Sequence, residues 1–133
     1  MENTNTQAAT QQNVQFITRQ NEAEIRPWGS FEVLYRGASF YWVKHISVLP
    51  GARLSLQKHE HRNETWVCVE GEVTAEIDGK EVPMKYGDMV TFKVGTVHRL
   101  SSVIGGVIIE IAYGDDVRED DIIRLQDDYG RSA

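Results

Sequence analysis

Short runs in which apolar and polar residues alternate recur along the chain, and most of them end at a glycine-containing turn. Alternation with a period of two is typical of a β-strand with one buried face, and closely spaced turns are typical of all-β folds. Asp78-Gly79, between two such runs, favours a two-residue hairpin. The sequence therefore predicts an all-β sandwich or barrel. The predicted strands cover residues 30–35, 40–49, 53–61, 65–69, 73–77, 82–84, 89–94, 98–103 and 107–113.

The two ends of the chain depart from this pattern. Residues 1–24 are rich in Gln, Asn and Thr and poor in large apolar side chains, so we expect a disordered or loosely docked N-terminal arm. The folded domain is expected to span residues 25–133. The segment 115–128 is acidic, which favours a solvated face, and its Ile122, Ile123 and Leu125 suit either a final strand or a short helical turn.

Composition limits the classes of function. A length of 133 residues fits one domain, and a net charge of −6 argues against nucleic acid as a partner. It does not exclude a phosphorylated small molecule, because a few local arginines can hold one phosphate. The N-terminus has no secretory signal pattern and no apolar run is long enough to cross a membrane, so we expect a cytoplasmic protein. The one cysteine, Cys68, lies in an apolar run and is expected to be buried.

Potential metal ligands gather in two places that both follow turns. Gln57, His59 and His61 are spaced two apart, so on one strand they would share a face, and Glu64 opens the next strand. His98 has a similar position after a later turn. If that face lines a barrel interior, these polar groups need a partner, and a divalent cation such as zinc, manganese, iron, nickel or cobalt would suit them. The alternative is a surface strand with solvated histidines.

Two motifs carry a family resemblance. Gly51-x5-Gln57-x-His59-x4-Glu64-x6-Gly71 resembles the first cupin motif, with Gln in place of its first His. Gly87-x5-Lys93-x-Gly95-x2-His98-x3-Ser102 resembles the second, with Lys for the usual Pro and Ser for the usual Asn. The resemblance implies a cupin-type double-stranded β-helix (jelly-roll) barrel. It also implies one divalent metal, with zinc favoured, on Gln57, His59, Glu64 and His98, and leaves His61 beside the site.

A narrower resemblance covers most of the predicted domain. The segments that carry it are RPWGSFEVL (26–34), PGARLSLQ (50–57), HRNETW (61–66), TVHRL (96–100), EDDIIR (119–124) and DDYGR (127–131). They are similar to the C-terminal domain of type II phosphomannose isomerases, which usually follows a nucleotidyltransferase domain that makes GDP-mannose. No Gly-rich phosphate loop precedes the barrel here, so we expect isomerisation alone. The resemblance also fits a homodimer.

The resemblance implies interconversion of mannose 6-phosphate and fructose 6-phosphate, which needs a general base and a phosphate-binding group. His61 is the candidate base. An equal alternative is that His61 only hydrogen-bonds to a metal ligand or lies solvated at the rim of the barrel. The family comparison favours Arg62, but strand parity turns it away from His59 unless a bulge or turn re-aims it. Arg53 has the right parity and is a second candidate for the phosphate. Two other functions stay open: a metal-binding cupin that binds a sugar or other small ligand without catalysis, and another metal-dependent cupin enzyme such as a dioxygenase.

Overall fold

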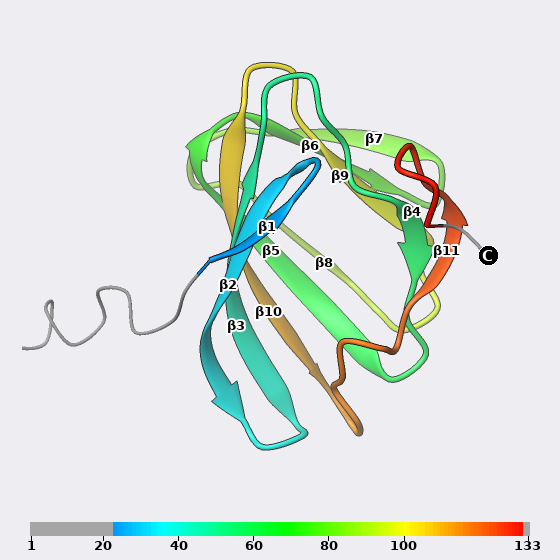
Figure 1. The fold of residues 1–133 in the computed structure, drawn as a ribbon. Helices are drawn as coiled ribbons and strands as arrows, with labels where there is room; N and C mark the ends of the chain where they lie inside the picture. Colours follow the sequence, from blue (N-terminus) through cyan, green and yellow to red (C-terminus); the bar gives the residue numbers. More distant parts are fainter. Residues whose placement is uncertain (1–22, 132–133) are drawn as a thin grey trace, which may run out of the picture.

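The chain folds into two antiparallel β-sheets that face one another and enclose the core (Figure 1). The computed structural model describes residues 23–131, and within them it contains eleven strands and no helix. The strands are β1 (Glu24–Arg26), β2 (Gly29–Gly37), β3 (Tyr41–Val48), β4 (Leu56–Lys58), β5 (Arg62–Gly71), β6 (Val73–Ile77), β7 (Lys80–Met84), β8 (Met89–Phe92), β9 (His98–Ser101), β10 (Gly106–Gly114) and β11 (Ile123–Gln126).

After β1–β3, which lie in one sheet, the chain passes back and forth between the two sheets, apart from the β6–β7 hairpin. The six-stranded sheet has the order β1-β2-β3-β10-β5-β8, and the five-stranded sheet has the order β11-β4-β9-β6-β7. Strict alternation of burial along β3 and β5 gives each of these strands an inward and an outward face. The predicted all-β barrel is therefore confirmed, and its inward positions are the ones that can form a site.

The structure corrects the predicted strands in two places and decides between two alternatives in a third. The predicted strand 53–61 is reduced to β4, because the chain turns away after Lys58 before β5 begins at Arg62. The segment 115–128 ends in a strand, β11, which pairs with β4. Strand β1, which the sequence reading did not predict, pairs with β2. Residues 1–22 of the expected N-terminal arm lie outside the described residues.

The core lies between the sheets and is built from the inward residues of both. The main cluster includes Trp28, Trp66 and Ile108, and Cys68 is fully buried in it, as its apolar surroundings predict. A second, smaller cluster forms around Trp42, which is also fully buried. Burial of these large side chains supplies most of the driving force for folding.

Two backbone features position the later strands. The predicted hairpin joins β6 to β7, with Asp78 at φ 50° and Gly79 at φ 81°, the left-handed values that such a turn requires. On β10, Gly114 lies opposite Arg62, and a Cβ there would come 2.0 Å from the carbonyl oxygen of His61. Gly114 thus lets the chain that leads into β5 approach β10 closely.

We expect Ile108→Ala to lower the free energy of unfolding by about 2–5 kcal/mol, because its fully buried side chain leaves a cavity. Ile104→Ala is the matched control, since this isoleucine is 61% exposed and its truncation should change the free energy by less than about 0.5 kcal/mol. Chemical denaturation followed by tryptophan fluorescence measures both. Equal losses in the two variants would contradict the assigned core.

Candidate functional site

A cavity of about 130 Å³ opens between the sheets. Strand β11 and the loop before it form part of its wall. Its lining combines core aromatic residues with charged and ligating side chains from β3, β5, β9, β10 and β11. Trp28 and Trp66 are buried core residues, as expected, and both also line the cavity. Polar groups at such a depth need specific partners, so their arrangement defines what the cavity can bind.

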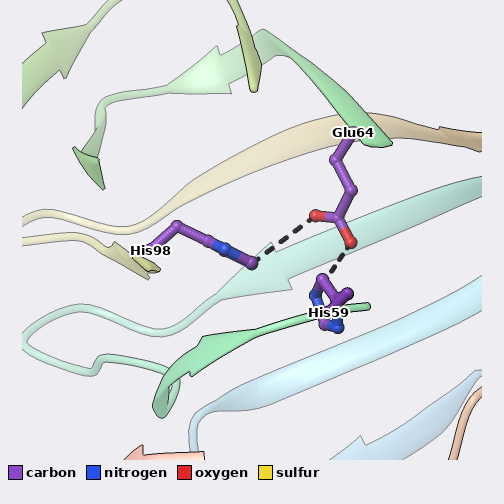
Figure 2. A group of neighbouring side chains, drawn as sticks. All are labelled: His59, Glu64 and His98. Atoms are coloured by element: carbon purple, nitrogen blue, oxygen red, sulfur yellow. Dashed lines mark ion pairs between the residues drawn. The ribbon is translucent and has the colours of Figure 1, made fainter. Parts of the chain in front are cut away.

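Three ligating side chains converge in this cavity (Figure 2). They are His59, just after β4, Glu64 on β5 and His98 at the start of β9. One ligand atom from each lies within 4.8 Å of the other two, and all three residues are buried. The Glu64 carboxylate lies 3.1 Å from Nε2 of His59 and 3.8 Å from Nε2 of His98. The sequence-predicted ligands therefore come together from both sheets.

Backbone carbonyl groups hold both imidazole rings. His59 Nδ1 lies 2.7 Å from the carbonyl oxygen of Asp121, and His98 Nδ1 lies 2.9 Å from that of Thr96. A carbonyl oxygen only accepts, so in each ring Nδ1 carries the proton and donates it. In the neutral ring Nε2 is then a bare acceptor that faces Glu64. This is the arrangement of metal-ligating histidines, whose second nitrogen is usually fixed by a carbonyl or carboxylate.

The charge on Glu64 is maintained despite its burial. Burial by itself would raise its pKa, but the adjacent His59 and the positive charge of Arg62 together hold the pKa well below its usual range. The pKa of His98 is lowered, chiefly because burial disfavours the charged ring. The cluster therefore presents an ionised carboxylate beside a neutral His98 imidazole.

Gln57 occupies the fourth predicted ligand position. It lies opposite His98 in the pairing of β4 with β9, and its side chain lines the same cavity. The amide Nε2 donates to the hydroxyl oxygen of Ser55 at 3.0 Å and to its carbonyl oxygen at 3.3 Å. The amide oxygen is then the atom that remains for a ligand.

The turn at residues 59–61 is held by Asp121, from the segment that leads into β11. Its carboxylate accepts from the backbone N–H of Glu60 at 2.9 Å and of His61 at 2.8 Å, while its carbonyl accepts from His59. Burial would raise the pKa of Asp121, but these two N–H groups lower it overall. The acidic segment is therefore more than the solvated face that its composition favours.

This turn also explains the position of Arg62. The strand breaks after Lys58 and restarts at Arg62, so the parity that would turn Arg62 away no longer applies. Its guanidinium donates to Oε2 of Glu64 at 2.9 Å, to Nε2 of His59 at 3.1 Å and to the carbonyl oxygen of Arg118 at 2.9 Å. It also stacks over Trp42, 4.6 Å from the ring centre. Arg62 thus contacts two of the three potential metal ligands.

Two other predicted site residues lie elsewhere. The expectation that His61 shares the inward face of His59 is wrong, because the turn points its ring outward: the side chain is 43% exposed and lies 3.3 Å from Asp115. Arg53 does not line the cavity; it makes a paired contact with Asp128, at 2.6 and 2.8 Å. The catalytic role of His61 and the phosphate role of Arg53 stay predictions without this geometric support.

Two buried charged residues beside the cluster were not predicted from the sequence. Glu110 accepts from the indole N–H groups of Trp42 at 2.9 Å and Trp66 at 3.2 Å, and burial, with the nearby charge of Glu64, raises its pKa to about 7. Lys44 lies over the ring of Trp42 and pairs with Glu119 at 2.5 Å. The alternation along each strand could have identified them, because both occupy positions that share the inward face with buried apolar residues.

Comparison with solved structures supports the cupin fold. KdgF from a Halomonas species superposes with a TM-score of 0.68 at 16% sequence identity, covering 78% of this chain and 94% of that one. An RmlC-like cupin from Shewanella frigidimarina superposes with a TM-score of 0.67 at 22% identity, covering 76% and 88%. Identities this low establish the fold alone.

Sequence comparison identifies closer relatives. The chain is 44% identical over 117 residues to the alginate biosynthesis protein AlgA of Pseudomonas aeruginosa, covering 86% of this chain and 24% of the relative. It is 34% identical over 122 residues to a mannose-1-phosphate guanylyltransferase of Sinorhizobium fredii, covering 90% and 24%. The chain thus spans about a quarter of the length of these curated relatives. The family model described as mannose-6-phosphate isomerase C-terminal matches residues 12–127, so the chain belongs to that family and folds as a cupin.

Proposed function

We propose that this chain is a metal-dependent aldose–ketose isomerase that interconverts mannose 6-phosphate and fructose 6-phosphate. The observation that carries the proposal is the convergence of three buried ligand atoms in a cavity of a chain that belongs to the mannose-6-phosphate isomerase C-terminal family. Cationic side chains in the lining of that cavity favour an anionic substrate.

The donor set fits a divalent cation. His98 is neutral with Nδ1 already donating, so its Nε2 can only accept, and the ionised Glu64 carboxylate also only accepts. Acceptors that face each other at depth are stabilised by a cation between them. His59, Glu64, His98 and the amide oxygen of Gln57 would hold it, and two imidazoles with oxygen donors suit zinc, manganese, iron, nickel or cobalt, of which zinc is our first choice.

The remaining residues define what the site does around that cation. When bound, a divalent metal would act as a Lewis acid that stabilises the negative charge developing on the sugar oxygens as a proton moves between C1 and C2. Arg62 holds Glu64 ionised and oriented, and Asp121 and Thr96 fix the two imidazole rings. Trp28 and Trp66 exclude water from one side of the cavity. These groups keep the ligands and the substrate in one geometry.

We expect His98→Ala to lower the affinity for Zn²⁺ by at least about tenfold. Loss of a residue that only hydrogen-bonds to a metal ligand already costs this much, and loss of a ligand should cost no less. His45→Ala is the matched control, because His45 lies on the same barrel outside the cavity lining. Competition with a chromogenic chelator measures both affinities. Unchanged zinc affinity in His98→Ala, with the fold intact by circular dichroism, would contradict the ligand set.

Asp121→Ala should lower the Zn²⁺ affinity by about tenfold although its carboxylate does not face the cluster, because the turn that carries His59 loses two hydrogen bonds. Asp120→Ala is the control, since Asp120 is 75% exposed and its contact with Arg118 is long, at 3.7 Å. The same chelator competition compares the two variants. Equal affinities would show that the turn does not depend on Asp121.

The isomerase itself is tested by a coupled assay for fructose 6-phosphate formed from mannose 6-phosphate, on zinc- and manganese-reconstituted protein. We expect turnover in the wild-type chain and loss of at least about 100-fold in His59→Ala, as removal of a ligand abolishes the Lewis acid. Absence of turnover at full metal occupancy would refute the proposal. Sugar binding without turnover would then point to a non-catalytic cupin, and oxygen consumption with ferrous iron to a dioxygenase.

A further inference from the structure

One arginine of the cavity lining has a buried nitrogen atom without a partner. It is Arg124 on β11, whose Nε is inaccessible to solvent and makes no hydrogen bond; in the part of the chain that the structure describes, Glu32 holds the other such side-chain atom. A buried, unpaired donor of a charged group is costly and rare in folded proteins. Because Arg124 lines the cavity, an anion bound there can supply acceptors to its guanidinium group.

The other cations of the lining already have partners. Arg62 contacts Glu64, Lys44 pairs with Glu119, and Arg131 makes a paired contact with Asp127 at 2.9 and 3.2 Å. Arg26 contacts Glu24 at 2.9 Å near the surface. The charge of Arg124 is therefore the one that its own protein neighbours leave least neutralised.

Two of these cations lie close enough to act on Arg124. Its pKa is lowered, first by burial and then by the positive charge of Arg131, with a smaller contribution from Arg26, while the carboxylate of Asp127 acts in the opposite direction. All three arginines line the same cavity, although they come from β11, β1 and the C-terminal segment. Like charges brought together at a cavity wall are stabilised by a bound anion, and guanidinium groups match the geometry of phosphate.

The register of the five-stranded sheet sets the distance between Arg124 and the cluster of His59, Glu64 and His98. Arg124 lies opposite Gln57 in the pairing of β11 with β4, and Gln57 lies opposite His98 in the pairing of β4 with β9. The backbones of Arg124 and His98 are thus two interstrand spacings apart, about 10 Å. The extended β11 beside β4 is visible in Figure 1. A hexose phosphate can reach from one to the other across Gln57.

We propose that Arg124, flanked by Arg26 and Arg131, binds the phosphate group of the substrate while the carbonyl end of the sugar faces His59, Glu64 and His98. This rests on the proposed isomerase for the identity of the sugar, but the anion site is defined by the arginines alone. It assigns the phosphate to a different residue from Arg53, which is bound to Asp128, and from Arg62, which is bound to the ligand cluster. The substrate class is a phosphorylated, not a neutral, sugar.

The test is isothermal titration of the zinc-loaded chain with inorganic phosphate, mannose 6-phosphate and mannose. We expect Arg124→Gln to weaken the binding of phosphate and of mannose 6-phosphate by at least about tenfold, the usual value of hydrogen bonds to a charged group. Arg124→Lys should recover part of the loss. Arg53→Gln, the matched control, should change the affinity less than twofold, and zinc content should be equal in all variants.

Stability separates a binding role from a structural one. Because the Nε of Arg124 has no partner, Arg124→Gln should keep or raise the midpoint of thermal unfolding, whereas removal of a structural contact would lower it. Wild-type affinity in Arg124→Gln, an equal loss in Arg53→Gln, or mannose binding as tightly as mannose 6-phosphate would overturn the proposal even if the chain is an isomerase. Phosphate binding that depends on Arg124 would support it even if the coupled assay finds no turnover.

Discussion

The carboxylate of Glu64 is the group on which the arrangement of the site depends. It is 1% exposed, and an ionised carboxylate at that depth is destabilising unless hydrogen bonds and positive charge surround it. Arg62 supplies one full charge at 2.9 Å, and the two imidazoles present their Nε2 atoms to it. Because His98 is held neutral by burial, its Nε2 and the Glu64 carboxylate, 3.8 Å apart, are two acceptors that face each other. The site is thus preorganised for a second cation.

That arrangement depends on a segment distant in sequence. Asp121, between β10 and β11, holds the turn of residues 59–61 and the ring of His59 at the same time. Arg62 donates to the carbonyl of Arg118 in the same segment, and Lys44 pairs with its Glu119. The segment thus joins the two sheets at the open end of the barrel, so that its ordering and the geometry of the ligands are linked. β11 then completes the cavity wall with Arg124.

Much of this could be predicted from the sequence, and the failures have a common physical cause. Alternation predicted most strands because it depends on local periodicity, and the resemblance to the cupin motifs implied Gln57, His59, Glu64 and His98 as ligands. The predicted strand 53–61 failed because a tertiary contact from Asp121 stabilises a turn at its end, which reversed the expected orientations of His61 and Arg62. Lys44 and Glu110 could have been found by applying the same parity to their strands. The roles of Asp121 and Arg124 could not, since they arise from the pairing of β11 with β4.

The net charge of −6 and the cationic cavity are consistent with one another. Five residues of the lining are arginine or lysine and three are glutamate, so the interior has the opposite balance from the chain as a whole. An acidic exterior repels polyanions, and a local excess of positive charge in a cavity lining attracts a small anion that can enter. Within the cavity Glu64 and Glu110 lie beside Arg62 and Lys44 at the ligand cluster, whereas Arg124 and Arg131 are at the β11 wall. A ligand with an anionic group at one end is therefore expected to place that group at the β11 wall.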